Sequence, residues 1–319
     1  MAVNVLVTGI GTIIGYGIIN SLRQSQYDVH IVGMDMNPNA VGKHWCDEFV
    51  VAEPADSDAY VGFIKKTIDA FGIDLVLIGI EQDMNRISQE REQLAGYIDK
   101  IVINSKSVVD LTNDKWDTYN FLKNNNFNYI ESTLDDDYDR LRELFEGDFL
   151  VKPRRSYSSR GVKIIQDRLT FEYYKQLLGE QFMAQRVVGD MNHEYTAATF
   201  SYGDGSASKP IILKRHLSFE GSTLDAEVVR SEIIEESIRA ITKVLKPIGP
   251  TNYQYRIENG KEYLLEINPR ISSSTSIRCA FGFNEAEMAI DYYLYGKKNS
   301  PIIRNGKAVR YISDYIELS

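Results

Sequence analysis

The chain has 319 residues, of which 43% are hydrophobic and 25% are charged, and its formal net charge is −9. This length allows two or three domains with a sizeable core, and the acidic balance argues against a nucleic-acid-binding protein with an extended basic surface. The two cysteines indicate neither a disulfide framework nor a metal site, which favours a reducing compartment. Because we find no signal peptide and no apolar run of about 20 residues, we expect a cytoplasmic protein that does not contact a membrane.

Strands and helices are predicted to alternate in the amino-terminal third of the chain. The apolar, strand-like segments are 3–7, 29–35, 46–54, 73–80 and 101–105. Residues 8–25 predict a glycine turn that leads into a helix, and apolar residues at helical spacing over 58–72 predict a second helix. Such alternation is typical of a parallel, doubly wound sheet.

The glycine turn itself allows a second interpretation. Gly9, Gly11 and Gly15 follow the first strand, and Asp35 ends the next one. This arrangement also occurs in dinucleotide-binding Rossmann units, although the third glycine departs from the NAD spacing. An NAD(P)-linked oxidoreductase therefore stays open as an alternative.

After residue 105 the predicted pattern becomes a mixture of helices and consecutive strands. Helices are expected at 112–126, 168–179, 228–246 and 283–296. Strands are expected at 148–153, 162–166, 182–188, 194–201, 209–217, 251–257 and 261–270. Thr112 or Asn113 is suited to cap the first helix, because both side chains can accept a hydrogen bond from its first turn. The chain as a whole thus combines α/β and α+β architecture.

The predicted hairpin at 148–166 has an unusually basic tip. Lys152 lies late in its first strand, and four more cations follow, namely Arg154, Arg155, Arg160 and Lys163. Cations this close repel one another unless an anion neutralises them, so in an acidic protein the cluster predicts a polyphosphate site. The alternative for Lys152 is an exposed lysine with a solvated ammonium group.

A second polar cluster lies on the last predicted hairpin. Glu266, Asn268 and Arg270 alternate along one strand, so their side chains share a face. If 258–260 form a three-residue loop, which we favour over a two-residue Asn-Gly turn, Gln254 joins that face. Carboxylate and amide oxygens favour Mg²⁺, and a site with one carboxylate normally uses the phosphates of a nucleotide as further ligands. The alternative is a solvated sheet face with a Glu266–Arg270 ion pair.

Taken in order, these segments resemble the ATP-grasp superfamily, and within it the carbamoyl-phosphate-synthase-like carboxylate–amine ligases. The similar segments are NDKWDTYNFLKNNNF, FLVKPRRSYSSRGVKII, FMAQRVVGDMNHEYTA and Gln254 with EINPRISSSTS. The resemblance implies an ATP-grasp fold. It would comprise a Rossmann-like pre-ATP-grasp domain at 1–105, a linker helix and small lid subdomain at 106–188, and a mixed α+β large subdomain with the metal site at 189–319.

The resemblance also implies roles for particular residues. Glu266 would bridge two Mg²⁺ ions, with Mn²⁺ as an alternative metal, while Gln254 and Asn268 each complete one coordination shell. Arg270 would face the acyl phosphate and Arg215 the γ-phosphate, both as catalytic residues. ATP would be bound by Lys115, Lys152, Arg154, Ser158, Ser159, Gly161, Gln185, Arg186, Val187, Val188 and Glu194. Glu81 is a candidate residue of the acceptor site.

We therefore expect an ATP-dependent ligase in which a carboxylate attacks the γ-phosphate and an amine then displaces phosphate to form an amide. The expected partners are these small-molecule substrates and, as one alternative, a second copy of the chain in a homodimer, with no nucleic acid. A kinase that stops at phosphoryl transfer and a non-catalytic nucleotide sensor are further alternatives. The sequence does not identify the carboxylate or the amine, because specificity lies in loops without readable motifs.

Overall fold

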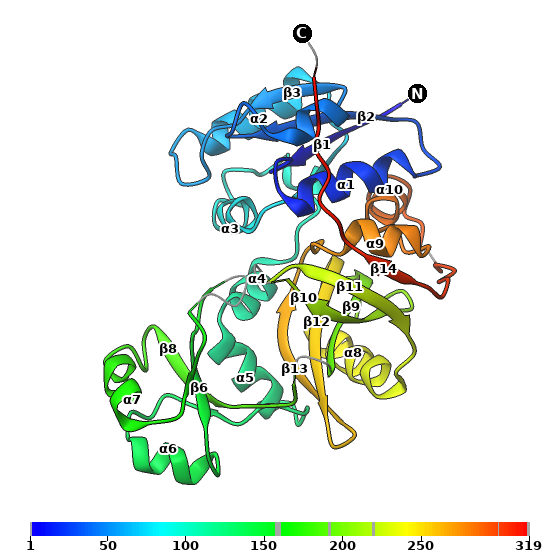
Figure 1. The fold of residues 1–319 in the computed structure, drawn as a ribbon. Helices are drawn as coiled ribbons and strands as arrows, with labels where there is room; N and C mark the ends of the chain where they lie inside the picture. The colour runs from blue at the N-terminus through cyan, green and yellow to red at the C-terminus, as the bar shows by residue number, and fades with distance from the viewer. Residues whose placement is uncertain (1, 157–160, 191–192, 219–220, 299, 318–319) are drawn as a thin grey trace.

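The computed structural model describes residues 2–156, 161–190, 193–218, 221–298 and 300–317. In this part of the chain there are three sheets (Figure 1): a parallel sheet at one end of the molecule, a six-stranded sheet in the middle and a smaller sheet at the other end. None of the described helices is long and apolar enough to cross a membrane.

The amino-terminal sheet is parallel and has the strand order β3-β2-β1-β4. Its elements are β1 (Val3–Thr8), α1 (Ile13–Arg23), β2 (Val29–Asp35), β3 (Glu48–Val51), α2 (Tyr60–Ala70), β4 (Leu75–Leu77) and α3 (Glu81–Gln89). Val5, Leu6 and Val7 of β1 are completely buried, because α1 packs on one face of the sheet and α2 on the other. The predicted parallel sheet is confirmed, but Glu81 begins a helix and does not directly follow a strand.

The strand predicted at 101–105 is wrong. Only Ile101 forms a bridge, to Val76 of β4. Further along the segment, the side chain of buried Asn104 donates to the carbonyl of Pro269 at 2.9 Å and accepts from the backbone N–H of Ile248 at 2.7 Å. Asn104 thereby connects the amino-terminal region to two strands of the middle sheet, at the residue after the strand Lys261–Asn268 and at the start of the strand Ile248–Glu258.

Two helices connect this region to the rest of the molecule, where the sequence predicts one helix over 112–126. They are α4 (Lys106–Asn113) and α5 (Lys115–Asn124). The break is at Asp114, which has an extended backbone and accepts a hydrogen bond from the Trp116 N–H at 2.9 Å. Asp114 therefore caps α5, and the prediction of Thr112 or Asn113 as the cap is wrong.

The small sheet is antiparallel, with the strand order β5-β8-β6-β7. Its elements are β5 (Ser132–Thr133), α6 (Tyr138–Leu144), β6 (Phe149–Pro153), β7 (Lys163–Ile165), α7 (Arg168–Lys175) and β8 (Phe182–Arg186). Phe149, Val151 and Phe171 pack together in a core that belongs to this body alone. The antiparallel pairing of β6 and β7 confirms the predicted basic hairpin.

The six-stranded sheet is also antiparallel, in the order β13-β12-β9-β10-β11-β14. Its elements are β9 (Glu194–Tyr202), β10 (Ile211–Leu217), β11 (Thr223–Val229), α8 (Glu232–Leu245), β12 (Ile248–Glu258), β13 (Lys261–Asn268), α9 (Thr275–Ala280), α10 (Glu285–Tyr295) and β14 (Lys307–Val309). One face is apolar and packs on α8, through Ile234 and Ile238 against Tyr253 and Tyr255. The helix predicted at 228–246 is shorter than expected because its first residues belong to β11.

The hairpin of β12 and β13 differs from the prediction in its turn. Glu258 pairs with Lys261, so the loop has two residues, Asn259 and Gly260, both with positive φ. The predicted three-residue loop is therefore wrong. A bulge at Leu265 shifts the register by one residue and places Gln254 directly opposite Glu266. The two side chains share a face as predicted, but the bulge brings them together and not the turn.

Candidate nucleotide and metal site

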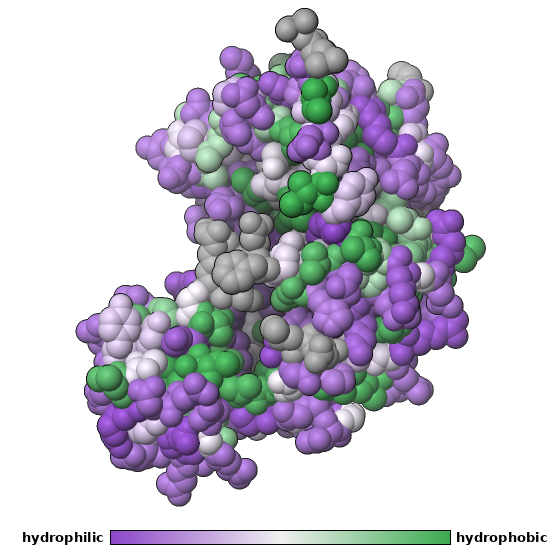
Figure 2. Space-filling view, in the orientation of Figure 1, coloured by the Kyte–Doolittle hydropathy of each residue, from purple (hydrophilic) through white to green (hydrophobic). Residues whose placement is uncertain are grey.

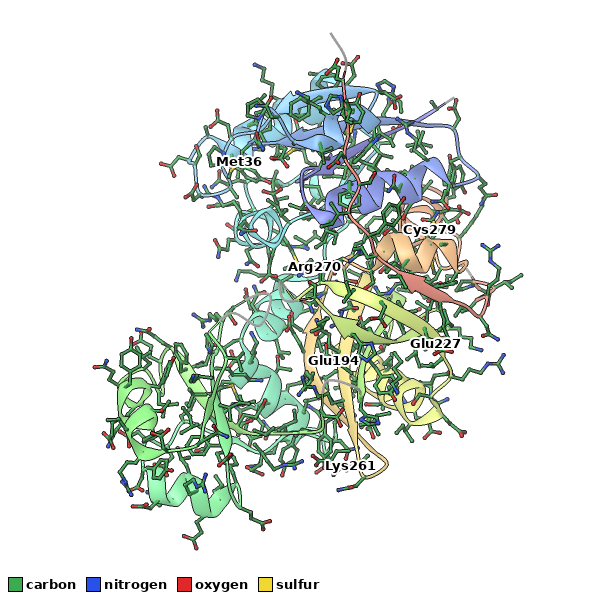
Figure 3. The ribbon with its side chains drawn as sticks, in the orientation of Figure 1. Met36, Glu194, Glu227, Lys261, Arg270 and Cys279 are labelled. Carbon is green, nitrogen blue, oxygen red and sulfur yellow. The ribbon has the colours of Figure 1, made fainter. Side chains whose placement is uncertain are left out.

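One face of the six-stranded sheet carries most of the polar residues that the sequence assigns to metal and phosphate. Gln254 of β12 is paired with Glu266 of β13 on one side and with Thr196 of β9 on the other. Arg215 of β10 is paired with Glu194, two residues before Thr196. Directly opposed residues of antiparallel strands point to the same side, so these side chains are neighbours. Figure 3 shows Glu194 within this sheet, and Figure 2 shows the molecular surface hollowed between this body and the small-sheet body.

The donor set on this face fits Mg²⁺. The Gln254 and Asn268 amide oxygens accept hydrogen bonds from Arg215 at 3.0 Å and Arg270 at 3.3 Å, and each oxygen keeps a second lone pair. The Glu266 carboxylate forms no hydrogen bond or ion pair with any residue that the structure describes. A carboxylate without a protein partner between two amide oxygens is a hard oxygen set of the kind that Mg²⁺ prefers. Within the described ranges no group of three or more His, Cys, Asp or Glu side chains is placed to hold a metal.

Glu194 joins two arginines on the same face. Its two carboxylate oxygens accept from Arg215 Nη2 at 3.0 Å and from Arg256 Nη2 at 3.1 Å. Arg215 also donates to Gln254 and, at 3.2 Å, to Thr223. Burial lowers the pKa of Arg215 and the Glu194 carboxylate opposes this shift. Both oxygens of Glu194 are thus used in ion pairs, so its predicted contact with ATP would have to use the remaining lone pairs.

Lys152 lies on β6 of the small sheet and is buried, with 8% of its surface exposed. Its ammonium group donates to Gln185 Oε1 at 2.7 Å. The Gln185 amide nitrogen in turn donates to the Ser132 hydroxyl at 2.8 Å. Gln185, which the sequence assigns to the nucleotide site, thus contacts the predicted phosphate-binding lysine directly, and Ser132 fixes the orientation of its amide.

The charge of Lys152 connects the two sheets. Burial and, next, the positive charge of Lys115 lower the pKa of Lys152 to about 7, while the Glu266 carboxylate opposes this shift and Arg256 adds to it. Glu266 and Arg256 belong to the six-stranded sheet, so Lys152 and the candidate metal ligands lie in one electrostatic environment. A polyphosphate between them would restore the charge of Lys152, because an anion favours the protonated lysine.

Arg154, which the sequence assigns to phosphate, is held by other partners. Its Nε and Nη2 donate to the two oxygens of Asp114 at 3.1 and 2.9 Å, and its Nη1 donates to the Gly179 carbonyl at 2.8 Å. Burial acts to raise the pKa of Asp114, but the hydrogen bonds from Arg154 and the Trp116 N–H, together with the charges of Arg154 and Arg155, outweigh it and the pKa is lowered. In this structure Arg154 therefore connects the small sheet to the start of α5.

The other residues predicted to contact phosphate lie near the tip of the basic hairpin. Lys115, the first residue of α5, donates from Nζ to the Ser156 carbonyl at 2.9 Å. Gly161 is exposed and has a φ of +80°, a conformation that favours glycine. Ser158 and Ser159 lie outside the described residues, so their predicted role has no structural description.

The segment 186–188, which the sequence assigns to the ATP site, runs from β8 towards the six-stranded sheet. The Arg186 guanidinium donates to Glu258 at 2.8 Å, and Arg256 donates to the Val188 carbonyl at 3.2 Å. Val188 itself is buried. The segment is thus fixed at the junction of the two bodies, between Lys152 and the polar face, and ATP binding there stays a prediction.

Arg270 follows β13 at the boundary with the amino-terminal region. Its Nη1 donates to the Ile271 carbonyl at 3.0 Å, and its Nη2 donates to Asn268. The same Nη2 lies 3.1 Å from Glu81 Oε2. The predicted catalytic arginine is thus next to a candidate metal ligand, and Glu81 reaches it from the amino-terminal side.

Several polar residues of the site were not recognised from the sequence. Completely buried Arg278 of α9 donates to Asn252 at 2.5 Å and to Thr196 at 2.9 Å. Asn252 is paired with Asn268 of β13, so Arg278 holds side chains that neighbour the candidate metal ligands. A signal was present, because Asn252, Gln254 and Arg256 alternate along β12 as polar residues of one strand face. No such pattern marks Arg278, whose role depends on tertiary packing.

The amino-terminal glycine turn is explained by close packing. Thr12 caps α1 by accepting from the Gly15 N–H at 3.1 Å, and a Cβ on Gly15 would lie 2.2 Å from the Gly9 carbonyl oxygen. Asp35, the residue that would bind ribose in the oxidoreductase alternative, accepts from the Gly11 N–H at 2.8 Å. The glycines and Asp35 thus stabilise the turn itself, and no dinucleotide is needed to account for them.

Comparison with known proteins agrees with this geometry. No curated protein matches the sequence. Residues 192–315 match a family described as ATP-grasp in the biosynthetic pathway with Ter operon, and this segment contains the candidate metal ligands and Arg270.

Solved structures match nearly the whole chain. N5-carboxyaminoimidazole ribonucleotide synthetase from Thermotoga maritima is 17% identical with a TM-score of 0.70, covering 94% of this chain and 78% of that one. Biotin carboxylase from Campylobacter jejuni is 11% identical with a TM-score of 0.76, covering 95% and 74%. L-amino acid ligase from Bacillus licheniformis is 16% identical with a TM-score of 0.67, covering 94% and 75%. The chain therefore has the ATP-grasp fold, and its resemblance to the ATP-grasp superfamily is confirmed.

Proposed function

We propose that the chain is an ATP-dependent ligase that activates a carboxylate as an acyl phosphate and transfers the acyl group to an amine. The observation that carries the proposal is the unpaired carboxylate of Glu266 between two amide oxygens, in the same electrostatic environment as buried Lys152. One solved relative is an L-amino acid ligase, and the biotin carboxylase was solved as a β-γ-ATP complex. The first similarity supports a ligase, and the second supports ATP as the phosphoryl donor.

The polar face would hold the metal and the phosphates. Glu266, Gln254 and Asn268 are the residues that would hold Mg²⁺, which neutralises phosphate charge and aligns the γ-phosphate when it is bound. Lys152, on the small sheet, contributes a positive charge when a bound anion keeps its ammonium group protonated. Arg215 adds a second charge, which Glu194 and Gln254 hold in a fixed position.

The proposed reaction has two steps, and the protein contributes position and charge to both. In the first, a carboxylate oxygen bonds to the γ-phosphorus and the bond from that phosphorus to the ADP oxygen breaks. In the second, the amine nitrogen, once it has lost a proton to become nucleophilic, bonds to the carbonyl carbon. A further proton leaves the nitrogen, and the carbon–oxygen bond to phosphate breaks. Arg270 would stabilise the negative charge that develops on the acyl phosphate and the tetrahedral intermediate.

The proposal is tested by crossing a panel of carboxylates with a panel of amines in the presence of ATP and Mg²⁺. We expect phosphate release that requires one acid and one amine together. Release of ADP with formation of a stable phosphorylated acid, and no need for an amine, would instead identify a kinase. Tight binding of a nicotinamide dinucleotide without any ATP binding would overturn the proposal.

A further inference from the structure

The ion pair of Glu81 and Arg270 joins the amino-terminal region to the candidate site. The two side chains are 22% and 14% exposed, so the pair is largely shielded from water. Glu81 is the first residue of α3, and its backbone position is therefore set by a helix start and not by a free loop. Among the described residues Arg270 has no other carboxylate within ion-pair distance.

Arg270 has few donors left for a substrate. A guanidinium has five N–H groups. Here Nη2 donates to Glu81 and Asn268, Nη1 donates to the Ile271 carbonyl, and Nε is buried with no acceptor in the described part of the chain. A carboxylate or phosphate binds a guanidinium best through two parallel N–H groups. A two-point contact with Nη1 and Nη2 requires one of the two acceptors of Nη2 to leave. Of these acceptors, Glu81 is the one that lies in the amino-terminal region.

The residues on either side of Glu81 line a separate cavity of about 730 Å³ at the carboxyl ends of the parallel strands. Ile80 and Gln82 are in its wall. The ionisable residues of the lining are Asp35, Glu53, Asp56, Asp83 and Arg86. Four acids and one base give this cavity a negative potential that attracts a cation. Glu81 thus lies where the wall of an acidic cavity meets the candidate site.

We propose that Glu81 is the exchangeable counter-ion of Arg270 and the residue that recognises the amine substrate. This inference rests on the proposed ligase function. The reacting carboxylate or acyl phosphate takes Arg270 Nη2, and the carboxylate of Glu81, no longer neutralised, then binds the ammonium group of the amine. The acceptor class is accordingly a cationic primary amine. Anion binding strengthens amine binding through this exchange, so the amine is held most tightly when its reaction partner is present.

The exchange at Arg270 is tested with inorganic phosphate as the probe, by calorimetric titration of the full chain saturated with ADP and Mg²⁺. We expect Glu81→Gln to bind phosphate about fivefold more tightly than wild type, because the internal competitor loses its charge. Arg270→Met should bind it weakly, and Glu81→Gln added to Arg270→Met should have little further effect. Exposed Glu92→Gln is the control. Equal or weaker phosphate binding by Glu81→Gln, or the same gain with and without Arg270, would overturn the exchange.

The recognition of the amine is tested with hydroxylamine, which is uncharged at neutral pH, and with a pool of the twenty standard amino acids as carboxylates and cationic amines. We expect Glu81→Gln to lower the ratio of amide to hydroxamate formation at least about tenfold relative to wild type, because only the cationic amines lose a charged partner. An equal loss with both nucleophiles would show that Glu81 has only a structural role. If the wild-type chain forms no hydroxamate, the proposed function and the amine role of Glu81 both fail, while phosphate binding still decides the exchange.

Discussion

The two sheets that enclose the candidate site differ in how their buried positive charges are neutralised. On the six-stranded sheet Arg215 is paired with Glu194, which also pairs with Arg256, so the cations are compensated by protein carboxylate. On the small sheet Lys152 is equally buried, but its hydrogen-bond partner is the neutral amide of Gln185 and it has no ion pair among the described residues. The pKa of Lys152 is accordingly lowered to about 7.

The ion pairs of Glu194 with Arg215 and Arg256, called the framework below, have a fixed geometry, whereas the charge of Lys152 depends on whether a ligand is bound. A buried ion pair with further hydrogen bonds keeps its geometry whether or not a ligand is present. A buried lysine without a counter-ion gains its charge when an anion arrives, so ligand binding and protonation are coupled. The small sheet also has a hydrophobic core of its own, separate from that of the six-stranded sheet.

The largest expected effect comes from Glu266, whose carboxylate lies on the polar face of the six-stranded sheet and has no protein partner among the described residues. Glu266→Gln keeps the shape of the side chain but removes the charge that would hold Mg²⁺, so ATP-dependent turnover should fall at least about a thousandfold. Release of ADP and phosphate, measured with saturating Mg²⁺, checks this. Glu262→Gln on the same strand is the matched control, because Glu262 contacts Asn128 outside the polar face. Near-normal turnover of Glu266→Gln would show that the metal site is elsewhere.

The next effect concerns the framework pairs. Glu194→Gln leaves the buried charges of Arg215 and Arg256 without their carboxylate, and we expect a loss of about 3 kcal/mol in the free energy of unfolding. Urea denaturation in the absence of nucleotide measures this loss. Glu236→Gln removes an exposed partner of Arg239 and should change stability by less than about 0.5 kcal/mol. If the two variants are equally stable, the ion pairs of the sheet do not form the framework described above.

The sequence predicted the fold and the polar strand face, but not the partners that fix each charge. Alternation along β13 marked Glu266 and Asn268 because strand periodicity is local. The partners of Arg154 and Arg270 lie 40 and 189 residues away, and no local pattern connects them.

The hairpin turn illustrates the same limit. Asn259-Gly260 suited a two-residue turn, yet only a bulge at Leu265 makes that turn compatible with Gln254 facing Glu266. A bulge depends on how a strand packs against its sheet, which single-residue preferences do not encode.

The pH dependence of stability distinguishes Lys152 from the framework cations. The pKa of Lys152 is about 7 in the folded chain, against an ordinary value of 10.5. Between these values the unfolded chain binds the proton and the folded chain does not. Burial of Lys152 therefore lowers the free energy of unfolding by its full amount below pH 7, and this loss disappears as the pH rises towards 10.5. Wild type should gain stability relative to Lys152→Met between pH 6 and 9, measured by urea denaturation without nucleotide; a constant difference would contradict the lowered pKa.

The smallest effect tests how Lys152 is held in position before the anion arrives. Ser132 accepts from the Gln185 amide nitrogen and so directs the amide oxygen towards Lys152. Ser132→Ala leaves that nitrogen without its acceptor and allows the amide to rotate, which should weaken ATP binding by about 1 kcal/mol, or roughly fivefold. Calorimetric titration with ATP and Mg²⁺ measures the change, and Thr133→Ala, on the opposite face of the same strand, is the control. Equal affinities for Ser132→Ala and wild type would mean that burial alone positions Lys152. The hydrogen bond from Gln185 to Ser132 would then contribute nothing to the position of the Lys152 ammonium group.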